Sequence, residues 1–387
     1  MRPIVFTQLK PSYWQFKTAL TLRKRGHKTE LVSLLEKFDR EEYLKAYDKI
    51  LCPGFKNLKV KTVLKQTFLH PIIVFSFLIN LLILKPRIAI CEGPPHYLSA
   101  FFIWFFRNRC KRVYFPYDMV SSRYKEPKKY SLPREIWGED YSFRNCDAII
   151  YKSAKYELNL LPKKFKIERK LKLGFPSYAQ KDLFVEPSLK NKLSRKDKKI
   201  HLVNAGTYTE GTLLYLSMAD YLYNLLKLGF QVHFFSVSQT LTKKDVEKIT
   251  KGEKELEKSL HVSDKFFSPK ALSEELSKYD YGLNINYLSD IAKDKAKEIA
   301  ATNKLASYLE AGIPIFINKE VKYFSNIVNK NGIGLVVEKK DMSDLKEKVK
   351  KINYSILTKN VLKFREKYSM ESHIDELIEF INRLSLS

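Results

Sequence analysis

The stretch from Asn303 to Pro314, which reads NKLASYLEAGIP, is the strongest indication of the fold of this chain. Apolar residues at helical spacing lead to Gly312, a residue typical of the position just after a helix, and a strand-like apolar run follows over 313–317. We expect the helix to begin at Asn303 and Lys304. The unpaired N–H groups of its first turn and the charge of Lys304 would then point at one spot, which predicts a phosphate-binding site.

This stretch resembles the second half of nucleotide-sugar glycosyltransferases of the GT-B type (group 1 or family 4-like). In that family a Lys-Leu-x-x-Tyr-x-x-x-Gly-x-Pro helix lies under the donor diphosphate, and an Ile-Gly-x-x-Val strand and an Asp-x-x-x-Leu helix follow it. The chain continues in the same order, with NGIGLVV over Asn331 to Val337 and then Asp341 to Leu345. The resemblance implies an α/β fold with two Rossmann-like domains facing across a cleft, and a C-terminal helix that returns to the first domain.

The length of 387 residues suits two domains of about 150–200 residues each. Strand and helix patterns alternate in both halves, which indicates parallel sheets covered by helices. We expect an N-terminal acceptor-binding domain over 1–175, a linker over 176–198 and a donor-binding domain over 199–366. The closing helix over 367–387 is expected to pack on the first domain.

The net charge of +27 has two interpretations. It is either a lysine-rich surface composition or an attraction to anions such as nucleotide sugars, anionic lipid headgroups or nucleic acid. No close pair of cysteines and no His-x-x-x-His pair occurs, so we expect a reducing compartment, no metal site and no cofactor. The first strand is not followed by Gly-x-Gly-x-x-Gly, and no Gly-x-x-x-x-Gly-Lys-Ser/Thr is present, which disfavours dinucleotide oxidoreductases and trinucleotide-dependent phosphoryl transfer.

The strongest apolar run covers residues 68–84, carries no charge and is flanked by Lys65 and Lys85. A second apolar stretch over 98–106 precedes four cations, Arg107, Arg109, Lys111 and Arg112. The first run is either a buried core helix or an interfacial helix on the membrane; a spanning helix is disfavoured, because it would split the first domain between two compartments. The N-terminus holds no apolar run long enough for a signal peptide. We therefore expect a cytoplasmic protein, peripheral on the inner face of the cell membrane through 68–84 and 98–112.

The donor-binding candidates lie at the ends of predicted strands and at the start of the 303–310 helix. The resemblance and the residue chemistry together select Gly206, Thr207, Phe267, Ser268, Asn284, Asn286, Asn303, Lys304, Ser307 and Glu310. Two features depart from the family. Basic residues do not follow Gly206, and Ser307 stands where many members have the acidic residue that binds the ribose; Glu310, one turn later, is the candidate substitute.

The candidates for acceptor chemistry lie in the first half. Inversion by direct displacement needs a general base near the acceptor hydroxyl, whereas retention relies on cations and N–H groups at the leaving phosphate. Glu92, His96 and Asp118 follow predicted strands at the edge where parallel sheets bind ligands, so one of them is the expected base.

These observations predict a glycosyltransferase that moves a sugar from a nucleotide-sugar donor to a lipid-linked or polysaccharide acceptor at the cytoplasmic membrane face. The alternative is a non-catalytic relative that keeps the fold as a scaffold or partner protein, which Ser307 and the missing basic residues support. Cations interleaved with aromatic residues on one face are not evident, so no nucleic-acid partner is expected.

Overall fold

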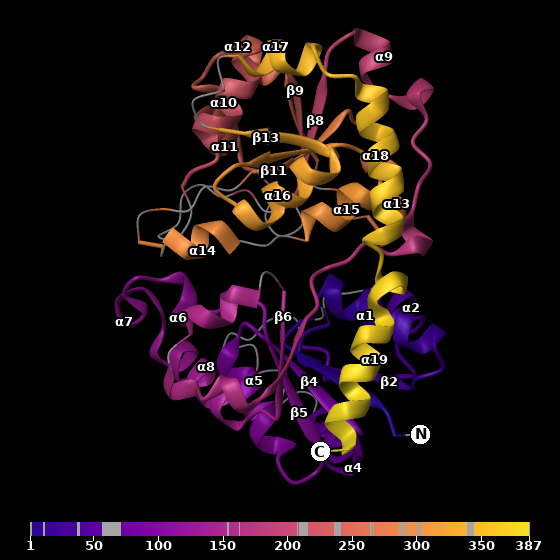
Figure 1. The fold of residues 1–387 in the computed structure, drawn as a ribbon, viewed down its shortest axis with the longest axis vertical. Coiled ribbons are helices and arrows are strands. Elements are labelled where there is room, and N and C mark those ends of the chain that lie inside the picture. The colour runs from indigo at the N-terminus through magenta and orange to yellow at the C-terminus, as the bar shows by residue number, and fades with distance from the viewer. Residues whose placement is uncertain are drawn as a thin grey trace. The chain divides into compact units, whose positions relative to one another are not determined.

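The computed structural model describes residues 2–10, 12–36, 39–55, 71–152, 155–161, 163–206, 208, 216–235, 241–263, 265, 267–285, 289, 291–292, 294–299, 303–338 and 344–386. The chain divides into two compact units (Figure 1). One consists of Met1–Pro176 and His373–Ser387, and the other of Ser177–Ser372. Of the expected linker over 176–198, only Pro176 belongs to the first unit, and the rest belongs to the second.

The described residues of the first unit form a seven-stranded parallel sheet in the order β3-β2-β1-β4-β5-β6-β7. Its strands are β1 Ile4–Gln8, β2 Thr29–Ser33, β3 Lys49–Leu51, β4 Ile88–Gly93, β5 Lys111–Pro116, β6 Ala148–Tyr151 and β7 Leu171–Gly174. Its α-helices are α1 Tyr13–Lys24, α2 Arg40–Tyr43, α4 Pro71–Ile83, α5 His96–Phe105, α6 Val120–Arg123, α7 Pro127–Tyr130, α8 Pro133–Asn145 and, from His373 onward, α19 Met370–Leu386.

Local signals explain the first helix. The side chain of Ser12 accepts a hydrogen bond from the Gln15 N–H and so caps α1, and the cations Arg23 and Lys24 lie in its last turn, where the helix dipole favours positive charge. The Gly-Pro-Pro sequence over 93–95 also predicts a loop over 92–96, and this prediction is wrong. Strand β4 continues to Gly93, which pairs with Pro116 of β5, and α5 already begins at His96.

The apolar helix α4 lies largely on the surface. Leu81 is buried and Leu84 just beyond the helix is buried, whereas Ile72, Phe75 and Ile83 are 81%, 65% and 62% exposed. The interpretation of this helix as part of a buried core is therefore wrong for the described residues 71–83. Among the described residues, no helix has the length and apolar character needed to cross a membrane.

The described residues of the second unit form a six-stranded sheet in the order β10-β9-β8-β11-β12-β13, again with parallel neighbours. Its strands are β8 His201–Ala205, β9 Gln231–Phe235, β10 Leu260–Ser263, β11 Tyr281–Asn284, β12 Ile315–Asn318 and β13 Gly334–Val337. Its α-helices are α9 Ser194–Asp197, α10 Ala219–Lys227, α11 Lys243–Thr250, α12 Lys254–Glu257, α13 Pro269–Leu276, α14 Asp294–Ile299, α15 Lys304–Glu310, α16 Lys322–Asn331, α17 Leu345–Lys350 and α18 Tyr354–Lys367.

One helix of the second unit differs from its prediction. The sequence indicates a single helix over 245–259, but Lys251 and Gly252 both have left-handed backbone conformations, with φ of 54° and 75°. This conformation ends α11, and the chain forms the separate short helix α12.

Candidate active site

The strand order of each sheet reverses at one position, between β1 and β4 in the first unit and between β8 and β11 in the second. Ligands of doubly wound sheets bind beyond the carboxyl ends of the strands at such a reversal. Each unit therefore has one edge that qualifies as a candidate ligand-binding site.

The edge of the second unit carries a lysine held against the sheet. The Lys304 ammonium donates a hydrogen bond of 2.7 Å to Oδ1 of Asn204, the fourth residue of β8. Gly206 allows this approach, since a Cβ there would lie 2.6 Å from Cε of Lys304. Burial lowers the pKa of Lys304 to about 8. Nδ2 of Asn204 is buried and has no hydrogen-bond partner among the described residues.

Tyr308 holds α15 in place over the sheet. Its hydroxyl lies 2.9 Å from the carbonyl of Leu283 in β11 and accepts a hydrogen bond of 3.2 Å from the N–H of Ala205 in β8. Its ring lies against Gly282, where a Cβ would come within 2.4 Å of the ring. Tyr308 is not among the site residues predicted from the sequence. A glycine inside a predicted strand is the signal that a side chain approaches closely there.

The other donor-binding candidates are spread around this edge. Asn303 is the N-cap residue of α15, Ser307 lies within α15 and Asn284 is buried at the end of β11. Phe267 packs edge-to-face on Phe235 at 5.5 Å, and Ser268 precedes α13 as its N-cap residue. Thr207 and Asn286 lie outside the described residues.

The prediction that Glu310 binds the ribose is wrong. Its buried carboxylate accepts a hydrogen bond of 2.8 Å from the N–H of Gln180, and its carbonyl accepts one of 2.9 Å from the N–H of Val185. Because the buried carboxylate is bound to the N–H of Gln180, it is not directed at a ribose as the sequence suggested. Its position near the C-terminal end of α15, one turn beyond Ser307, causes this difference.

The edge of the first unit is centred on Glu92. The carboxylate accepts hydrogen bonds of 2.9 Å from Nε2 of Gln8 and of 2.8 Å from Oγ of Ser12. Burial raises the pKa of Glu92 to about 8, against the lowering effect of these two hydrogen bonds. Glu92 is therefore a carboxyl group whose proton can be lost near neutral pH, as a general base requires.

Asp118 lies beside this carboxyl group in an ion-pair network. Its Oδ1 accepts a hydrogen bond of 2.7 Å from the Lys152 ammonium, and Arg123 pairs with the same oxygen. Burial acts to raise the pKa of Asp118, but the charges of Arg123 and Lys152 lower it to about 2. Asp118 is thus a permanently charged partner of two cations, which argues against its role as the base.

His96 is not free to act as a base. The ring is fully buried, with Nε2 at 2.9 Å from the carbonyl of Asp118 and Nδ1 at 2.6 Å from the hydroxyl of Tyr114. Because a carbonyl only accepts, Nε2 carries the proton and Nδ1 accepts from Tyr114. Burial lowers the pKa of His96 to about 4. The expectation that His96 serves acceptor chemistry is corrected: it positions the backbone of Asp118.

Sequence reasoning missed Gln8, Ser12, Arg123 and Lys152. Gln8 ends β1, and Lys152 follows β6 directly, so both stand at the same edge of the sheet as Glu92. A polar residue at the end of each predicted strand was the available signal.

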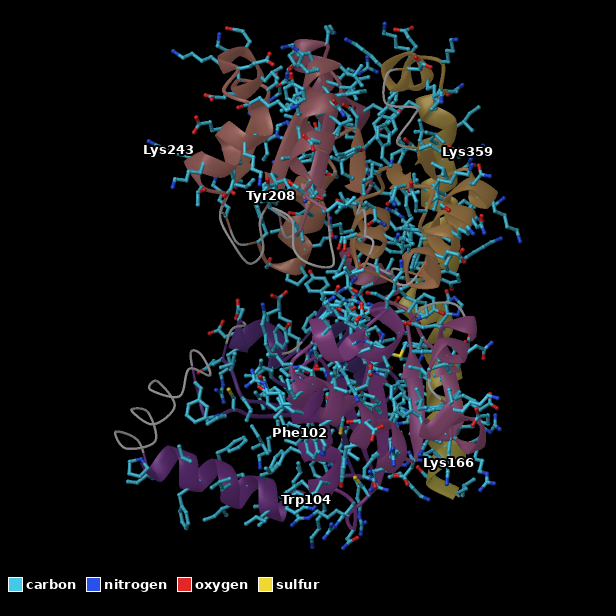
Figure 2. All side chains as sticks on the ribbon, turned by 90° about the vertical axis from the view of Figure 1, so that its left-hand side faces the viewer. Phe102, Trp104, Lys166, Tyr208, Lys243 and Lys359 are labelled. Atoms are coloured by element: carbon cyan, nitrogen blue, oxygen red, sulfur yellow. The ribbon has the colours of Figure 1, made fainter. Side chains whose placement is uncertain are left out.

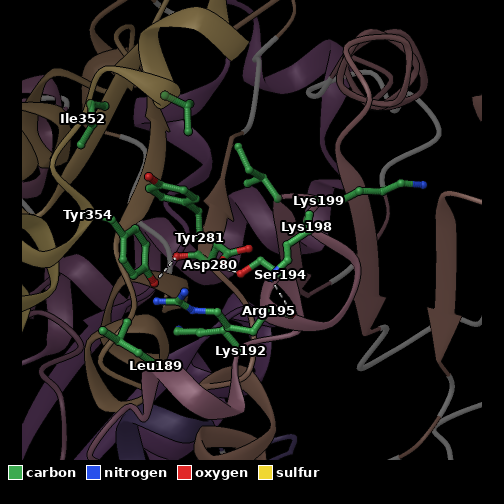
Figure 3. A pocket seen from close by; sticks show the side chains of 12 residues that line it. Leu189, Lys192, Ser194, Arg195, Lys198, Lys199, Asp280, Tyr281, Ile352 and Tyr354 are labelled. Carbon is green, nitrogen blue, oxygen red and sulfur yellow. Dashed lines mark hydrogen bonds between the residues drawn. The ribbon is translucent and has the colours of Figure 1, made fainter.

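A separate cavity of about 360 Å³ lies elsewhere in the second unit (Figure 3). Its lining includes Ile200 and Asp280, which precede β8 and β11, so it opens at the amino-terminal ends of these strands. Lys192 points its ammonium away to the carbonyls of Ser277 and Tyr279, at 2.9 and 2.5 Å. This cavity is therefore not the edge that carries Lys304. Within the described residues, no three His, Cys, Asp or Glu side chains are arranged to hold a metal ion.

Two Rossmann-like units with parallel sheets of seven and six described strands define a protein of the GT-B fold class. Residues 231–379 match the family described as Glucosyltransferase 3-like, C-terminal domain. This match confirms the predicted glycosyltransferase class in the second half of the chain, and likeness to solved structures confirms the predicted fold over its whole length.

Three solved structures illustrate the likeness. Sucrose-phosphate synthase from Thermosynechococcus elongatus is 11% identical with a TM-score of 0.68, and 99% of each chain is covered. HepE from Anabaena, solved with UDP and glucose, is 10% identical with a TM-score of 0.63, covering 99% of this chain and 100% of its own. A glycosyltransferase from Rickettsia africae is 12% identical with a TM-score of 0.59 and 99% coverage of both chains. A search of curated protein sequences finds no match to this chain.

Proposed function

We propose that the protein transfers a sugar from a nucleotide-sugar donor to a lipid-linked or glycan acceptor at the inner face of the cell membrane. The observation that carries the proposal is the Lys304–Asn204–Gly206 cluster, which lies at the strand reversal of a unit that contains the matched family domain.

Lys304 is the group that would stabilise the leaving diphosphate. Because burial disfavours its charged form, an anion bound beside it is the partner that restores the full charge. The buried Nδ2 of Asn204 is a donor that a phosphate oxygen can use. Since HepE was solved with UDP and, in another structure, with UDP-glucose, UDP-sugars are the first donors to test.

Glu92 is the group that would activate the acceptor. In its ionised form the carboxylate takes the proton of the acceptor hydroxyl while that oxygen bonds to the anomeric carbon and the bond to the diphosphate breaks. Lys152 is positioned by Asp118 close enough to lower the pKa of Glu92, which favours the ionised form. Gln8 and Ser12 hold the carboxylate in one orientation.

The surface of the first unit supports a lipid-linked acceptor. Helix α4 has no charged residue, and its exposed apolar residues are Ile72, Phe75, Leu78, Ile79, Leu82 and Ile83. Phe101 and Trp104 of α5 are also exposed. An apolar helix face of this kind is buried when the helix lies in a membrane interface.

The test has two parts. Donor binding to the purified protein is measured from the rise in melting temperature, and sugar transfer is measured with a membrane extract as acceptor. We expect at least one nucleotide sugar to raise the melting temperature and Lys304→Met to weaken its binding about 10- to 100-fold, as for loss of a charge-assisted hydrogen bond. Lys330→Met, at an exposed lysine of the same unit, is the control and should bind as the wild type does. No stabilising nucleotide sugar together with no transfer would refute the proposal, and binding without transfer would favour the scaffold alternative.

A further inference from the structure

A basic cavity of about 530 Å³ lies in the first unit beside the ends of α4 and α5. Among the described residues, its lining includes a single carboxylate, Asp147, and six cations: Arg2, Arg87, Arg107, Arg109, Lys111 and Arg112. Neither the donor-binding edge nor the Glu92 edge includes any of these cations. Like charges gathered around one cavity repel each other, so a bound anion would relieve the repulsion.

Three of these cations form the walls of the cavity. Arg112 makes two hydrogen bonds to Asp147, of 2.8 and 2.9 Å. Arg87 donates to Asn382 of α19 at 2.9 Å. Arg109 donates to the carbonyl of Leu82 at 2.7 Å and lies over the ring of Phe105 at 4.4 Å. Arg109 therefore joins the cavity to the end of the exposed helix α4.

The other three cations are available to a ligand. The side chains of Arg2, Arg107 and Lys111 make no hydrogen bond or ion pair within the described part of the chain. The guanidinium of Arg107 lies 5.5 Å from the ring centre of Trp104, which is 46% exposed. A cation without an ion pair that adjoins an exposed aromatic ring, as Arg107 does, is typical of interfaces with anionic lipid.

The apolar and basic features are contiguous. Figure 2 shows Trp104 at the surface, at the same end of the first unit as α4. The hydrogen bond from Arg109 to Leu82 fixes this adjacency, because Leu82 itself belongs to the exposed apolar face. A ligand that satisfies both features must carry a negative headgroup and an apolar tail.

We propose that this cavity binds the phosphate headgroup of an anionic phospholipid while the apolar side chains of α4 and α5 enter the outer part of the bilayer. The inference rests on the membrane location in the proposed function and adds the lipid class and the residues that select it. A free phosphate ester would use the cations but leave the apolar face uncovered, so the two features together favour a membrane lipid.

The experiment is flotation of the full-length protein with vesicles of phosphatidylcholine alone or with phosphatidylglycerol added. We expect binding to require phosphatidylglycerol and to weaken as salt rises. The triple variant Arg2→Gln, Arg107→Gln, Lys111→Gln should bind about 100-fold more weakly, because each cation near an anionic surface contributes roughly a fivefold factor. The matched control removes the same charge from exposed lysines of the second unit, with Lys243→Gln and Lys359→Gln (both labelled in Figure 2) and Lys254→Gln.

Each outcome bears on the inference. Equal binding to both vesicle types, or an equal loss in the control triple variant, overturns the headgroup site in favour of apolar contact alone or net charge alone. Phe75→Gln with Leu82→Gln should also reduce binding, while Leu132→Gln, at another exposed apolar residue, should not. Nucleotide-sugar binding is measured on the same variants without vesicles. If the wild type binds vesicles but no nucleotide sugar, the result counts against the proposed function and not against the lipid site. If it binds a nucleotide sugar but no vesicles, the result counts against the lipid site alone.

Discussion

Glu92 is the residue whose environment departs most usefully from that of a free side chain. Its carboxylate is held by Gln8 and Ser12, and burial raises its pKa to about 8. We predict that Glu92→Gln lowers the transfer rate at least about 100-fold. In the wild type, the rate should rise with pH through about 8, as the carboxyl loses its proton, and this limb should be absent in the variant. Steady-state rates between pH 6 and 9 check both expectations.

The raised pKa of Glu92 also makes the stability of the native state depend on pH, in the direction opposite to the rate. This dependence is a control for the substitution. The native carboxyl binds its proton up to about pH 8, whereas the unfolded one releases it near its ordinary pKa of 4.5. The native state therefore binds more protons between these values, and stability falls as pH rises through that window, by at most about 1.4 kcal/mol per pH unit. Glu92→Gln should remove this slope in a melting series. A folded Glu92→Gln variant that keeps the wild-type rate and its rise with pH would contradict a catalytic role.

At the scale of elements, the position of α15 depends on two glycines that meet different parts of it. Gly282 faces the buried ring of Tyr308, which cannot move, whereas Gly206 faces the flexible end of Lys304. We predict that Gly282→Ala lowers the free energy of unfolding by about 1–3 kcal/mol, as overpacking does. Gly206→Ala should displace the ammonium and weaken donor binding, and it should also strain the backbone, because Gly206 has a φ of 158° that residues with a side chain rarely adopt.

Chemical denaturation and nucleotide-sugar titration of both glycine variants separate these effects. Each variant is a control for the other, because Gly282→Ala tests the packing of α15 on the sheet and Gly206→Ala tests the position of Lys304. Full donor affinity in Gly206→Ala would show that Lys304 does not need its present position, and would weaken the donor half of the proposed function.

At the scale of the whole molecule, α19 joins two parts of the chain that are far apart in sequence. Residues from His373 onward belong to the first unit, although the preceding helix belongs to the second. Its inner face is fully buried at Ile374, Leu377 and Ile381. We predict that Leu377→Ala destabilises the first unit by about 2–5 kcal/mol.

Hydrogen exchange followed peptide by peptide can measure this effect in each unit. Leu386→Ala is the matched control on the same helix, since that side chain is 90% exposed. Protection in the second unit and its response to donor should stay as in the wild type. Equal loss of protection in both units would mean that they unfold together, contrary to the prediction.

Local sequence patterns were enough to predict several helices and strands. Helical spacing followed by Gly312 predicted α15 and the strand after it, and the alternation of helices and strands predicted the parallel sheets. These signals are local because helix periodicity and turn residues act over a few positions.

The contacts between side chains that are distant in sequence depend on how the chain folds in three dimensions. Gln8 and Glu92 are 84 residues apart, and their hydrogen bond depends on the register of β1 against β4. Three further features also depend on the tertiary structure. They are the burial that raises the pKa of Glu92, the hydrogen bonds of both ring nitrogens of His96, and the exposure of the apolar face of α4. Hydropathy shows that a segment is apolar, but what covers it, and which distant charge lies beside a carboxyl group, depends on how the strands and helices assemble.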